Sequence, residues 1–407
     1  MEYRISKRRL TLLILIIIIL TWFLVLLPAT NIVPSPLSFP WYQQPHPSFT
    51  TNSTSFVWTN DNNRSLEDML AYAKQYTQHI LPQQEDGIPG SALTTKEQVI
   101  SFRNLVQCWT QQGNWQYHST SSVLPHFQDP LYGRCDRQWQ RQHKDNPFLP
   151  PRPATQYQWR PPAHCPLVSD TIHTTDWCDI LHGRHMLLVG DLVQYQLHDL
   201  LLDALREGPT VCYGELNCKD HTICSRPRKA RLRYIRNDIL SKRKKVNVAN
   251  GQPKVDVVEW PFLGPLSAFK IVLLNRSPVM EDDMTFVQQL AATMVAIRKI
   301  QPSALILYRS SFIGHPFCDE AQQPYQLGTT HRQQLPFGWS EYQRRNLLAQ
   351  AVVEQAGGVY LDMAYSLDQQ PDGHIGGSDC LRYCMPGPLD SWALLFYNVF
   401  LALGVPY

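Results

Sequence analysis

The residues with the clearest chemical potential begin at Gly190-Asp191-Leu192, which follow the apolar run His185–Val189. This run predicts a buried strand, and the periodicity of Val193–Arg206 predicts a helix after it. A side chain at such a strand-to-helix junction is well placed to attack an acyl group as a nucleophile. Leu192, however, has no lone pair with which to attack a carbonyl. Whether the chain is an enzyme or only the framework of one therefore depends on this leucine.

Similar junctions recur later in the chain. Strands are predicted at Arg231–Ile235, Lys270–Leu274, Ala304–Tyr308 and Gly358–Leu361, and helices at Asp283–Ile300, Ser340–Ala356 and Asp390–Leu403. This alternation predicts an α/β fold of three layers, with a mostly parallel sheet covered by helices on both faces. Ligand sites in such sheets lie at the carboxyl ends of the strands. We therefore expect several polar residues to converge there: Asp191, Asn275, Arg276, Ser310, Ser311 and Asp379.

The start of the chain predicts a membrane anchor. Leu10–Leu27 carries no charge, and such a run is long enough to cross a bilayer core. Because it exceeds the apolar core of a cleaved signal peptide and Pro28-Ala29-Thr30 is a poor cleavage site, we interpret residues 10–28 as a retained signal anchor. Basic residues cluster in residues 1–9 and none follow the anchor closely. This asymmetry predicts a cytoplasmic tail and a lumenal remainder, the type II orientation.

Residues 29–93 are interpreted as a lumenal stem. Its first part is rich in proline, which favours an extended, semi-rigid chain. The apolar spacing of Leu66–Leu81 predicts a lone stem helix. Thr94 and Glu97 then have the spacing of a capping box that opens a helix. The folded domain is therefore expected to span residues 94–407.

The cysteines and glycosylation sequons agree with a lumenal location. All ten cysteines follow the anchor, at positions 108, 135, 165, 178, 212, 218, 224, 318, 380 and 384. An even set in an oxidising compartment predicts several disulfides. Since no closely spaced cysteine pair has matching histidines, we expect neither a metal site nor another cofactor. Asn52 and Asn63 begin sequons in a polar stretch and are predicted to be glycosylated, whereas the sequon at Asn275 is expected to be buried and unmodified.

The net charge of +3 implies no particular partner. One segment, Arg226–Lys245, holds ten basic residues and a single acidic one, Asp238. We interpret it as a solvated loop and strand edge, and the alternative is a binding face for an acidic glycan. Nucleic acid is not an expected partner, because the segment is lumenal and few aromatic residues interleave with it.

Five motifs between Cys108 and the C-terminus carry a family resemblance. They are Cys108-Trp109…Gly113-Asn114-Trp115, Tyr132-Gly133-Arg134-Cys135-Asp136, Gln158-Trp159-Arg160-Pro161…Cys165, Gly190-Asp191, and Asp372-Gly373-His374…Asp379-Cys380-Leu381-Arg382-Tyr383-Cys384-Met385-Pro386-Gly387-Pro388-Leu389-Asp390-Ser391-Trp392. The last is the most specific. Together they resemble the PC-esterase branch of the SGNH/GDSL superfamily, which includes the trichome-birefringence-like polysaccharide O-acetyltransferases. The resemblance implies an SGNH (flavodoxin-like) domain, and acyl transfer to or from a glycan.

The resemblance also implies that the catalytic machinery is degenerate. Members of the family attack with a serine after Gly-Asp, while a D-x-x-H motif supplies the aspartate and histidine. The matching positions here are Leu192 for the serine and Arg382 for the histidine; Asp379 is kept. Arginine has no acceptor and cannot serve as a base at neutral pH. The resemblance further implies that Asn275 and Gly190 form the oxyanion hole.

The two replacements look coupled. Arg382 lies three residues from Asp379, and we hypothesise that its guanidinium pairs with a carboxylate that burial would otherwise leave unpaired. Leu192 would fill the space of a hydroxyl and its water. The site would then be remodelled for packing.

Other readings remain open. Ser311, or less readily Ser310, is an alternative nucleophile, with His315 or His374 as its base; loop serines more often cap, and most histidines are structural. The alternative to an oxyanion role for Asn275 is that it caps the end of a strand. His198 is interpreted as a packed helix residue. Candidates for substrate binding are Asp191, Arg276, His315 and His374.

Three functions are therefore carried forward. The first is a non-catalytic type II membrane protein of the secretory pathway, expected in the Golgi, that binds a glycan or an active paralogous acyltransferase. The second is a working acyltransferase or esterase with the substitute residues. The third is a secretory scaffold unrelated to glycans.

Overall fold

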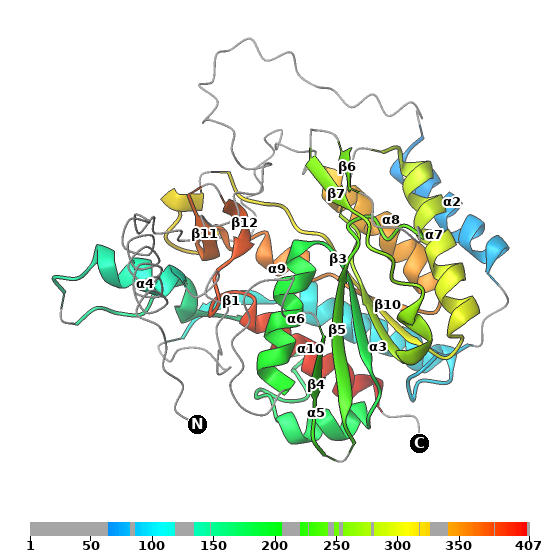
Figure 1. Ribbon diagram of the computed structural model, residues 1–407, viewed down its shortest axis with the longest axis horizontal. Coiled ribbons are helices and arrows are strands. Elements are labelled where there is room, and N and C mark those ends of the chain that lie inside the picture. The colour runs from blue at the N-terminus through cyan, green and yellow to red at the C-terminus, as the bar shows by residue number, and fades with distance from the viewer. Residues whose placement is uncertain are drawn as a thin grey trace, which may run out of the picture. The chain divides into compact units, whose positions relative to one another are not determined.

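The computed structural model (Figure 1) describes residues 64–404 except 82–85, 119–133, 147, 206–219, 227, 243–247, 252–254, 278–280, 317, 326–340 and 378. The predicted tail and anchor, most of the predicted stem and the sequons at Asn52 and Asn63 lie outside these residues, as do Cys212 and Cys218. In the part of the chain that is described, no helix is long and apolar enough to cross a membrane.

A six-stranded sheet carries the fold, in the order β10-β9-β8-β3-β5-β4. Its strands are β3 (Met186–Gly190), β4 (Asp220–Ile223), β5 (Ala230–Arg236), β8 (Ile271–Leu274), β9 (Leu305–Arg309) and β10 (Val359–Leu361). All neighbours are parallel except the edge strand β4, which is antiparallel to β5. Numbered along the chain, the five parallel strands stand in the order 2-1-3-4-5, which is that of flavodoxin-like doubly wound sheets. The predicted α/β fold with a mostly parallel sheet is confirmed.

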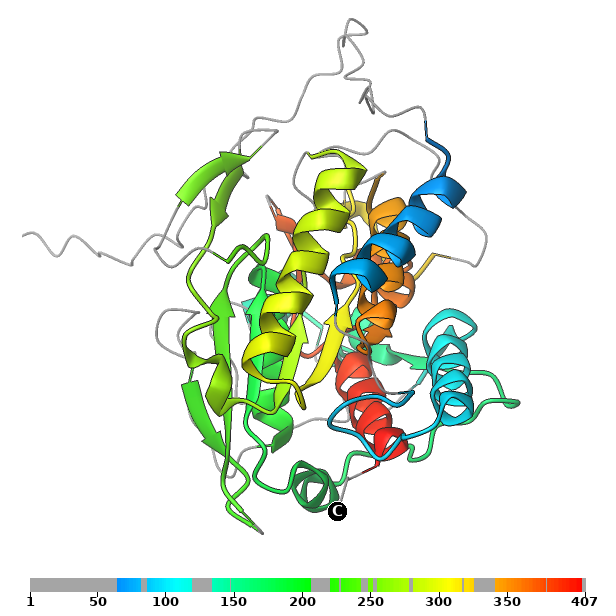
Figure 2. The same ribbon diagram turned by 90° about the vertical axis from the view of Figure 1, so that its right-hand side faces the viewer.

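Helices cover both faces of the sheet, which gives three layers (Figures 1 and 2). One face is covered by α2 (Leu66–Ile80), α7 (Asp283–Ile300) and α8 (Tyr342–Gln355), and the other by α3 (Lys96–Gln111), α5 (Thr174–Leu181), α6 (Leu192–Leu205) and α10 (Asp390–Leu403). In β3, Met186 and Leu188 point into one core, whereas Leu187 and Val189 point into the other. A strand buried on both faces must be apolar throughout, which explains the continuous apolar run that predicts β3 in the sequence.

The predicted elements of the sheet region match the structure closely. Each of the five predicted strands and four predicted helices corresponds to an observed element within two residues at either end. Periodicity does not reveal the edge strand or the two-stranded ladders, because short polar strands carry too little pattern. These ladders are β1 (Asn114–Tyr117) with β2 (Tyr157–Arg160), β6 (Val248–Gly251) with β7 (Val255–Val258), and β11 (His374–Gly376) with β12 (Asp379–Tyr383).

The helix expected to stand alone in the stem does not do so. It is α2, and its buried residues Met69, Ala73 and Thr77 lie in the layer formed with α7 and α8. The lone-helix prediction is wrong, because the apolar stripe of α2 packs on the domain. The core therefore includes residues before position 94.

The predicted capping box is displaced by one residue. In α3 the box is formed by Thr95 and Gln98 rather than by Thr94 and Glu97. Both pairs fit the motif, so spacing alone cannot choose the register. The amide of Gln98 decides it, since its Oε1 accepts from the backbone N–H groups of Thr94 and Thr95 at 2.9 and 3.1 Å.

Among the described residues, four disulfides link segments far apart in the chain: Cys108–Cys165, Cys135–Cys384, Cys178–Cys224 and Cys318–Cys380. None of the cysteines in the described ranges is a free thiol. The prediction of several disulfides is confirmed. Two of the bridges hold β12 and the residue after it, through Cys380 and Cys384.

Part of the basic segment lies within the sheet. Its residues Ala230–Arg236 form β5, which has a strand on each side. Arg231 pairs with Asp220 of β4 at 2.5 Å, and the buried Arg236 pairs with Asp238 at 3.1 Å. The interpretation as a strand edge is wrong for this part, because β5 is an inner strand, although the side chain of Arg231 is still 43% exposed.

Candidate functional site

Of the polar residues expected to converge at the carboxyl ends of the strands, Asn275, Arg276 and Ser311 are joined by hydrogen bonds beside β3, β8 and β9. Among the described residues, no hydrogen bond or ion pair joins Asp379 to this group. Asn275 follows β8, and its Nδ2 donates to the carbonyl of Arg309 at 3.2 Å and to Oγ of Ser311 at 2.9 Å. Strands β3 and β8 are the neighbours between which the strand order reverses, the place where doubly wound sheets bind ligands. The predicted edge of the sheet is therefore the candidate site.

Gly190 allows β3 and the chain after β8 to approach each other. A Cβ on Gly190 would lie 3.0 Å from the carbonyl oxygen of Asn275 and 3.1 Å from the Cβ of Gln194. Only glycine fits this spacing without a shift of the neighbours. The two residues proposed for an oxyanion hole, Gly190 and Asn275, are thus in contact, and Oδ1 of Asn275 is buried without a hydrogen-bond partner.

Asp191 is the centre of a hydrogen-bond cluster. Its Oδ1 accepts from the N–H of Gln194 at 3.0 Å and from Arg309 at 3.1 Å, and its Oδ2 accepts from Oγ of Ser277 at 3.1 Å. Arg309 is fully buried at the end of β9 and also donates to Oε1 of Gln194 at 3.0 Å. Burial lowers the pKa of Arg309, and the carboxylate of Asp191 opposes that shift.

Arg309 is a site residue that the sequence analysis misses. Its one signal is that it ends an otherwise apolar run, at the position where β9 reaches the sheet edge. The guanidinium also lies over the ring of Trp392, 5.2 Å from its centroid. A buried cation held by Asp191 and an aromatic face fixes the geometry of this edge.

The hypothesis that Arg382 pairs with Asp379 is confirmed. Nε and one terminal nitrogen of Arg382 lie 2.6 and 2.5 Å from Oδ2 of Asp379. Oδ1 of Asp379 accepts from the backbone N–H of Arg382 at 3.0 Å. The side chains of Asp379 and Arg382 are only 10% and 13% exposed, so this ion pair is largely withdrawn from solvent.

Leu192 is buried at the first position of α6, and Gln196 joins this helix to β12. Nε2 of Gln196 donates to the carbonyl of Tyr383 at 2.6 Å, and Oε1 of Gln196 accepts from the N–H of Tyr383 at 3.1 Å. Leu192 and Gln196 are four residues apart and share a helix face. The end of β12 at Tyr383 therefore contacts α6 one turn after Leu192, and Asp379 and Arg382 lie earlier on the same strand.

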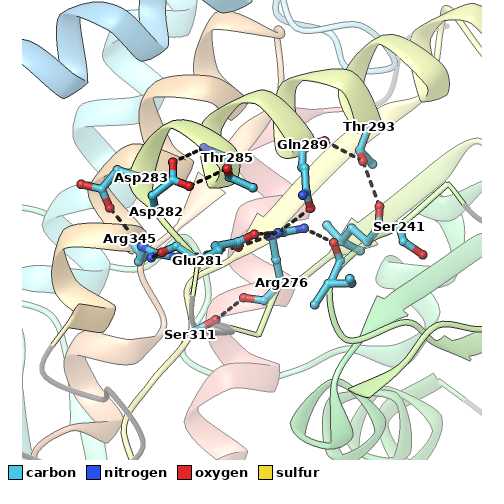
Figure 3. Close-up of polar contacts among 12 residues, drawn as sticks. Ser241, Arg276, Glu281, Asp282, Asp283, Thr285, Gln289, Thr293, Ser311 and Arg345 are labelled. Carbon is cyan, nitrogen blue, oxygen red and sulfur yellow. Dashed lines mark hydrogen bonds and ion pairs between the residues drawn. The ribbon is translucent and has the colours of Figure 1, made fainter. Parts of the chain in front are cut away.

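Arg276 is buried in an ionic network beside the site (Figure 3). Its terminal nitrogens contact the carboxylate of Glu281 at 2.6 Å, the amide of Gln289 at 2.9 Å and the carbonyl of Ile239. Arg345 belongs to the same network and contacts Glu281 as well. The expectation that Arg276 binds a substrate is corrected, because its terminal groups hold the loop after β8 onto α7.

The substitute catalytic residues have other partners. Oγ of Ser311 donates to the carbonyl of Arg276 at 2.8 Å and accepts from Asn275, and no histidine takes part in these bonds. His315 and His374 instead contact each other, with Nδ1 and Nε2 2.7 Å apart. The described contacts therefore provide no hydroxyl–imidazole pair built on Ser311.

His198 is a buried, packed residue of α6, as predicted. It is fully buried near the rings of Tyr195, Tyr234 and His221. Burial, with a smaller contribution from His221, lowers the pKa of His198 to about 3. This histidine is neutral at any physiological pH.

The one group of three side chains of metal-binding type among the described residues is formed by Cys108, His164 and Cys165. Its two sulfurs are joined in a disulfide. A disulfide offers no thiolate to a metal ion, so this group is read as a structural bridge with a nearby histidine.

No model of a known protein family matches the chain, and no curated protein matches it. The site is accordingly interpreted from its own geometry. It holds an aliphatic side chain, a buried ion pair and a cluster of bonded polar groups, and it presents neither a nucleophile nor a base at the three positions that the resemblance aligns.

Proposed function

We propose that this protein is a membrane-anchored, lumenal homologue of SGNH-type glycan O-acyltransferases that has lost catalysis and binds a glycan or a partner. The chain would face the lumen of the secretory pathway, in the Golgi, with residues 10–28 as its anchor. Its SGNH-like domain would offer a binding surface built on an enzyme framework.

The observation that carries this proposal is the closed ion pair of Asp379 and Arg382 on β12, whose last residue, Tyr383, is bound by the helix that starts with Leu192. In an acyl-transfer site the carboxylate orients an imidazole, which takes a proton from the nucleophile. Here the carboxylate is neutralised by a permanent cation. The aliphatic side chain of Leu192 can form no acyl intermediate.

An aromatic face on β1 and β2 supports the glycan as ligand. Trp115 lies opposite Trp159 and Tyr117 lies opposite Tyr157 in this antiparallel ladder, so all four side chains point to one side. The face runs from the buried Trp159 to Tyr117, which is 62% exposed. Sugar rings pack their C–H faces on such rings, while an acyl donor needs no platform of this kind.

The proposal is tested by restoring the triad. The double variant Leu192→Ser with Arg382→His is assayed on an aryl acetate, and labelled with a fluorophosphonate probe, beside the unmodified chain. We expect no labelling of the unmodified chain and a gain of both signals in the double variant, because Asp379 is in place. Single variants are the matched controls, since a serine without a base, or a base without a serine, gains little. Labelling of the unmodified chain would instead establish a working enzyme with other residues.

A further inference from the structure

His315 and His374 face each other from segments far apart in the sequence. His315 lies in the loop after β9, and His374 begins β11; both are buried. Their facing nitrogens, Nδ1 of His315 and Nε2 of His374, are 2.7 Å apart. The remaining nitrogens each meet a main-chain carbonyl: Nε2 of His315 that of Asp368 at 3.0 Å, and Nδ1 of His374 that of Arg382 at 3.2 Å.

The number of protons in this chain of contacts follows from the hydrogen-bond chemistry. A carbonyl oxygen only accepts, so the nitrogen that faces each carbonyl must carry a proton. A neutral imidazole has one proton, so two neutral rings would leave both facing nitrogens bare and their lone pairs opposed. Turning a proton inward would leave a buried carbonyl without its donor. All three contacts are satisfied only when the four nitrogens hold three protons, which gives the pair one positive charge.

The short separation favours a proton over a metal ion between the rings. Two nitrogens that bind one zinc ion, each at about 2.0 Å, lie about 3.3 Å apart in a tetrahedral site. The observed 2.7 Å is shorter and suits a hydrogen bond. In the described ranges, these two histidines also belong to no group of three metal-binding side chains.

We propose that His315 and His374 form a proton-binding latch, in which one shared proton fastens the β11–β12 hairpin to the loop after β9. The latch does not depend on the proposed function. It does concern the same part of the molecule, because the hairpin carries Asp379 and Arg382.

The buried surroundings of the pair disfavour positive charge, and a second proton would in addition face the charge of the first. The ring of Tyr383 stacks on His374 at 4.1 Å, and burial keeps this phenol neutral by raising its pKa. Burial and the neighbouring His315 lower the pKa of His374.

The remaining ionisable neighbours come from five separate positions around the pair. Tyr325 lies with its ring centroid 5.9 Å from that of His315. Burial raises the pKa of Asp368, after α9 (Ala364–Leu367), to about 8 and that of Asp372, in the short helix Pro371–Gly373, to about 6. A cationic pair would supply positive charge beside these carboxyl groups. Asp319, in the short helix Cys318–Glu320, accepts from the N–H of Gly377 at 2.9 Å, and Arg382 is engaged by Asp379.

A shared proton predicts a minimum in the pH profile of hairpin opening, and therefore a maximum in protection from exchange. Below about pH 6.5, the ordinary imidazole pKa, the two rings carry four protons in the open state and three in the closed state, so the latch opens as the pH falls. Above that pH the open rings carry only two protons, so the latch opens as the pH rises. A difference of one proton changes the opening constant by about tenfold per pH unit on either side.

Hydrogen exchange by mass spectrometry on the purified full-length chain, from pH 5 to 9, tests the latch. After correction for intrinsic exchange, we expect protection in the peptides that cover residues 372–384 to be greatest near pH 6.5 and to fall on both sides. In His374→Gln a neutral amide can donate to Nδ1 of His315, so the pair needs no extra proton and the maximum of protection near pH 6.5 should disappear.

Two further variants keep the test decisive. His315→Gln is the mirror variant if His374→Gln does not fold, and it should also remove the maximum of protection near pH 6.5. The exposed His164 is the control, because His164→Gln should leave the maximum in place. A profile that falls only on the acidic side, or one that His374→Gln does not change, would overturn the shared proton.

Discussion

A carboxylate that forms an ion pair with a permanent cation can no longer orient a catalytic histidine, and Asp379 is in this position. Both of its oxygens are engaged by Arg382, one through the guanidinium and the other through the backbone N–H. The pair is nearly buried, so neither member can be removed without leaving a charge in a poorly solvated place.

Arg382→Leu should therefore destabilise the protein by about 3 kcal/mol, the low end of the range for breaking a buried ion pair. The free energy of unfolding in urea at pH 7 measures the loss. The double variant Asp379→Asn with Arg382→Leu is the matched control. It removes both charges and should regain most of the loss, and a chain as stable with Arg382→Leu as without it would count against the ion pair.

The buried His198 gives stability a dependence on pH with a defined sign. Its pKa is about 3 in the folded chain against 6.5 for the free side chain, so below pH 6.5 the unfolded chain binds a proton that the folded chain refuses. Stability should then fall with falling pH, by about 1.4 kcal/mol per unit. Buried carboxyl groups such as Asp238, whose pKa burial raises to about 6, act in the opposite direction.

Comparing His198→Leu with the unmodified chain isolates this histidine from those carboxyl groups. The leucine variant should be similar in stability at pH 7 and more stable by about 2 to 3 kcal/mol at pH 4.5, over two pH units of linkage. Urea unfolding at both pH values measures this. An equal difference at the two pH values would show that His198 takes up its proton in the folded chain.

Among the elements, α6 organises the site more than any strand does. Gln194 reaches across to Arg309 and to the carbonyl of Leu273, and Gln196 holds both backbone groups of Tyr383. The whole helix is buried, so these amides face other elements. The ladder of β1 and β2 has the contrasting role, since it exposes the ring of Tyr117.

Tyr117→Ala should weaken binding to glycans while leaving the fold intact. Tyr117 is the exposed end of the aromatic face, and its ring meets that of Tyr157 edge-on at 5.8 Å. Losing one stacking ring should reduce affinity by about two- to tenfold, from the 0.5–1.5 kcal/mol typical of an aromatic contact. A glycan array with the full-length chain measures it.

The exposed Phe148, on another segment, provides the control, because Phe148→Ala removes an even more accessible ring outside the ladder. Equal losses in both variants, or no glycan bound by the unmodified chain, would argue for a scaffold without glycan affinity.

At the scale of the whole molecule, disulfides tie the early part of the domain to its end. Cys135–Cys384 spans 249 residues, against 46 for Cys178–Cys224. The longer bridge removes more freedom from the unfolded chain, about 5 kcal/mol against about 4 kcal/mol in the chain-entropy description.

Replacing both cysteines of the long bridge by serine should therefore lower the midpoint of thermal unfolding more than replacing both cysteines of the short one. Differential scanning calorimetry under identical conditions measures the two shifts. The opposite order would indicate that the unfolded chain with its remaining bridges is already compact around Cys135 and Cys384.

The sequence by itself determined the layers. Buried strands such as Met186–Gly190 must be apolar on both faces, and helices such as Asp283–Ile300 repeat apolar residues with the helical period. Both patterns are local in the sequence, so they predict these elements. It also identified Asp379 and Arg382, because three residues of separation suffice to suggest a pair.

Only the tertiary structure decided which of these groups meet. Arg309, Gln196 and the opposed rings of His315 and His374 come from segments far apart in the chain, and no local period relates them. The prediction that α2 stands alone was wrong for the same reason. Its stripe of apolar residues shows that one face must be covered, but long-range packing decides that α7 and α8 cover it.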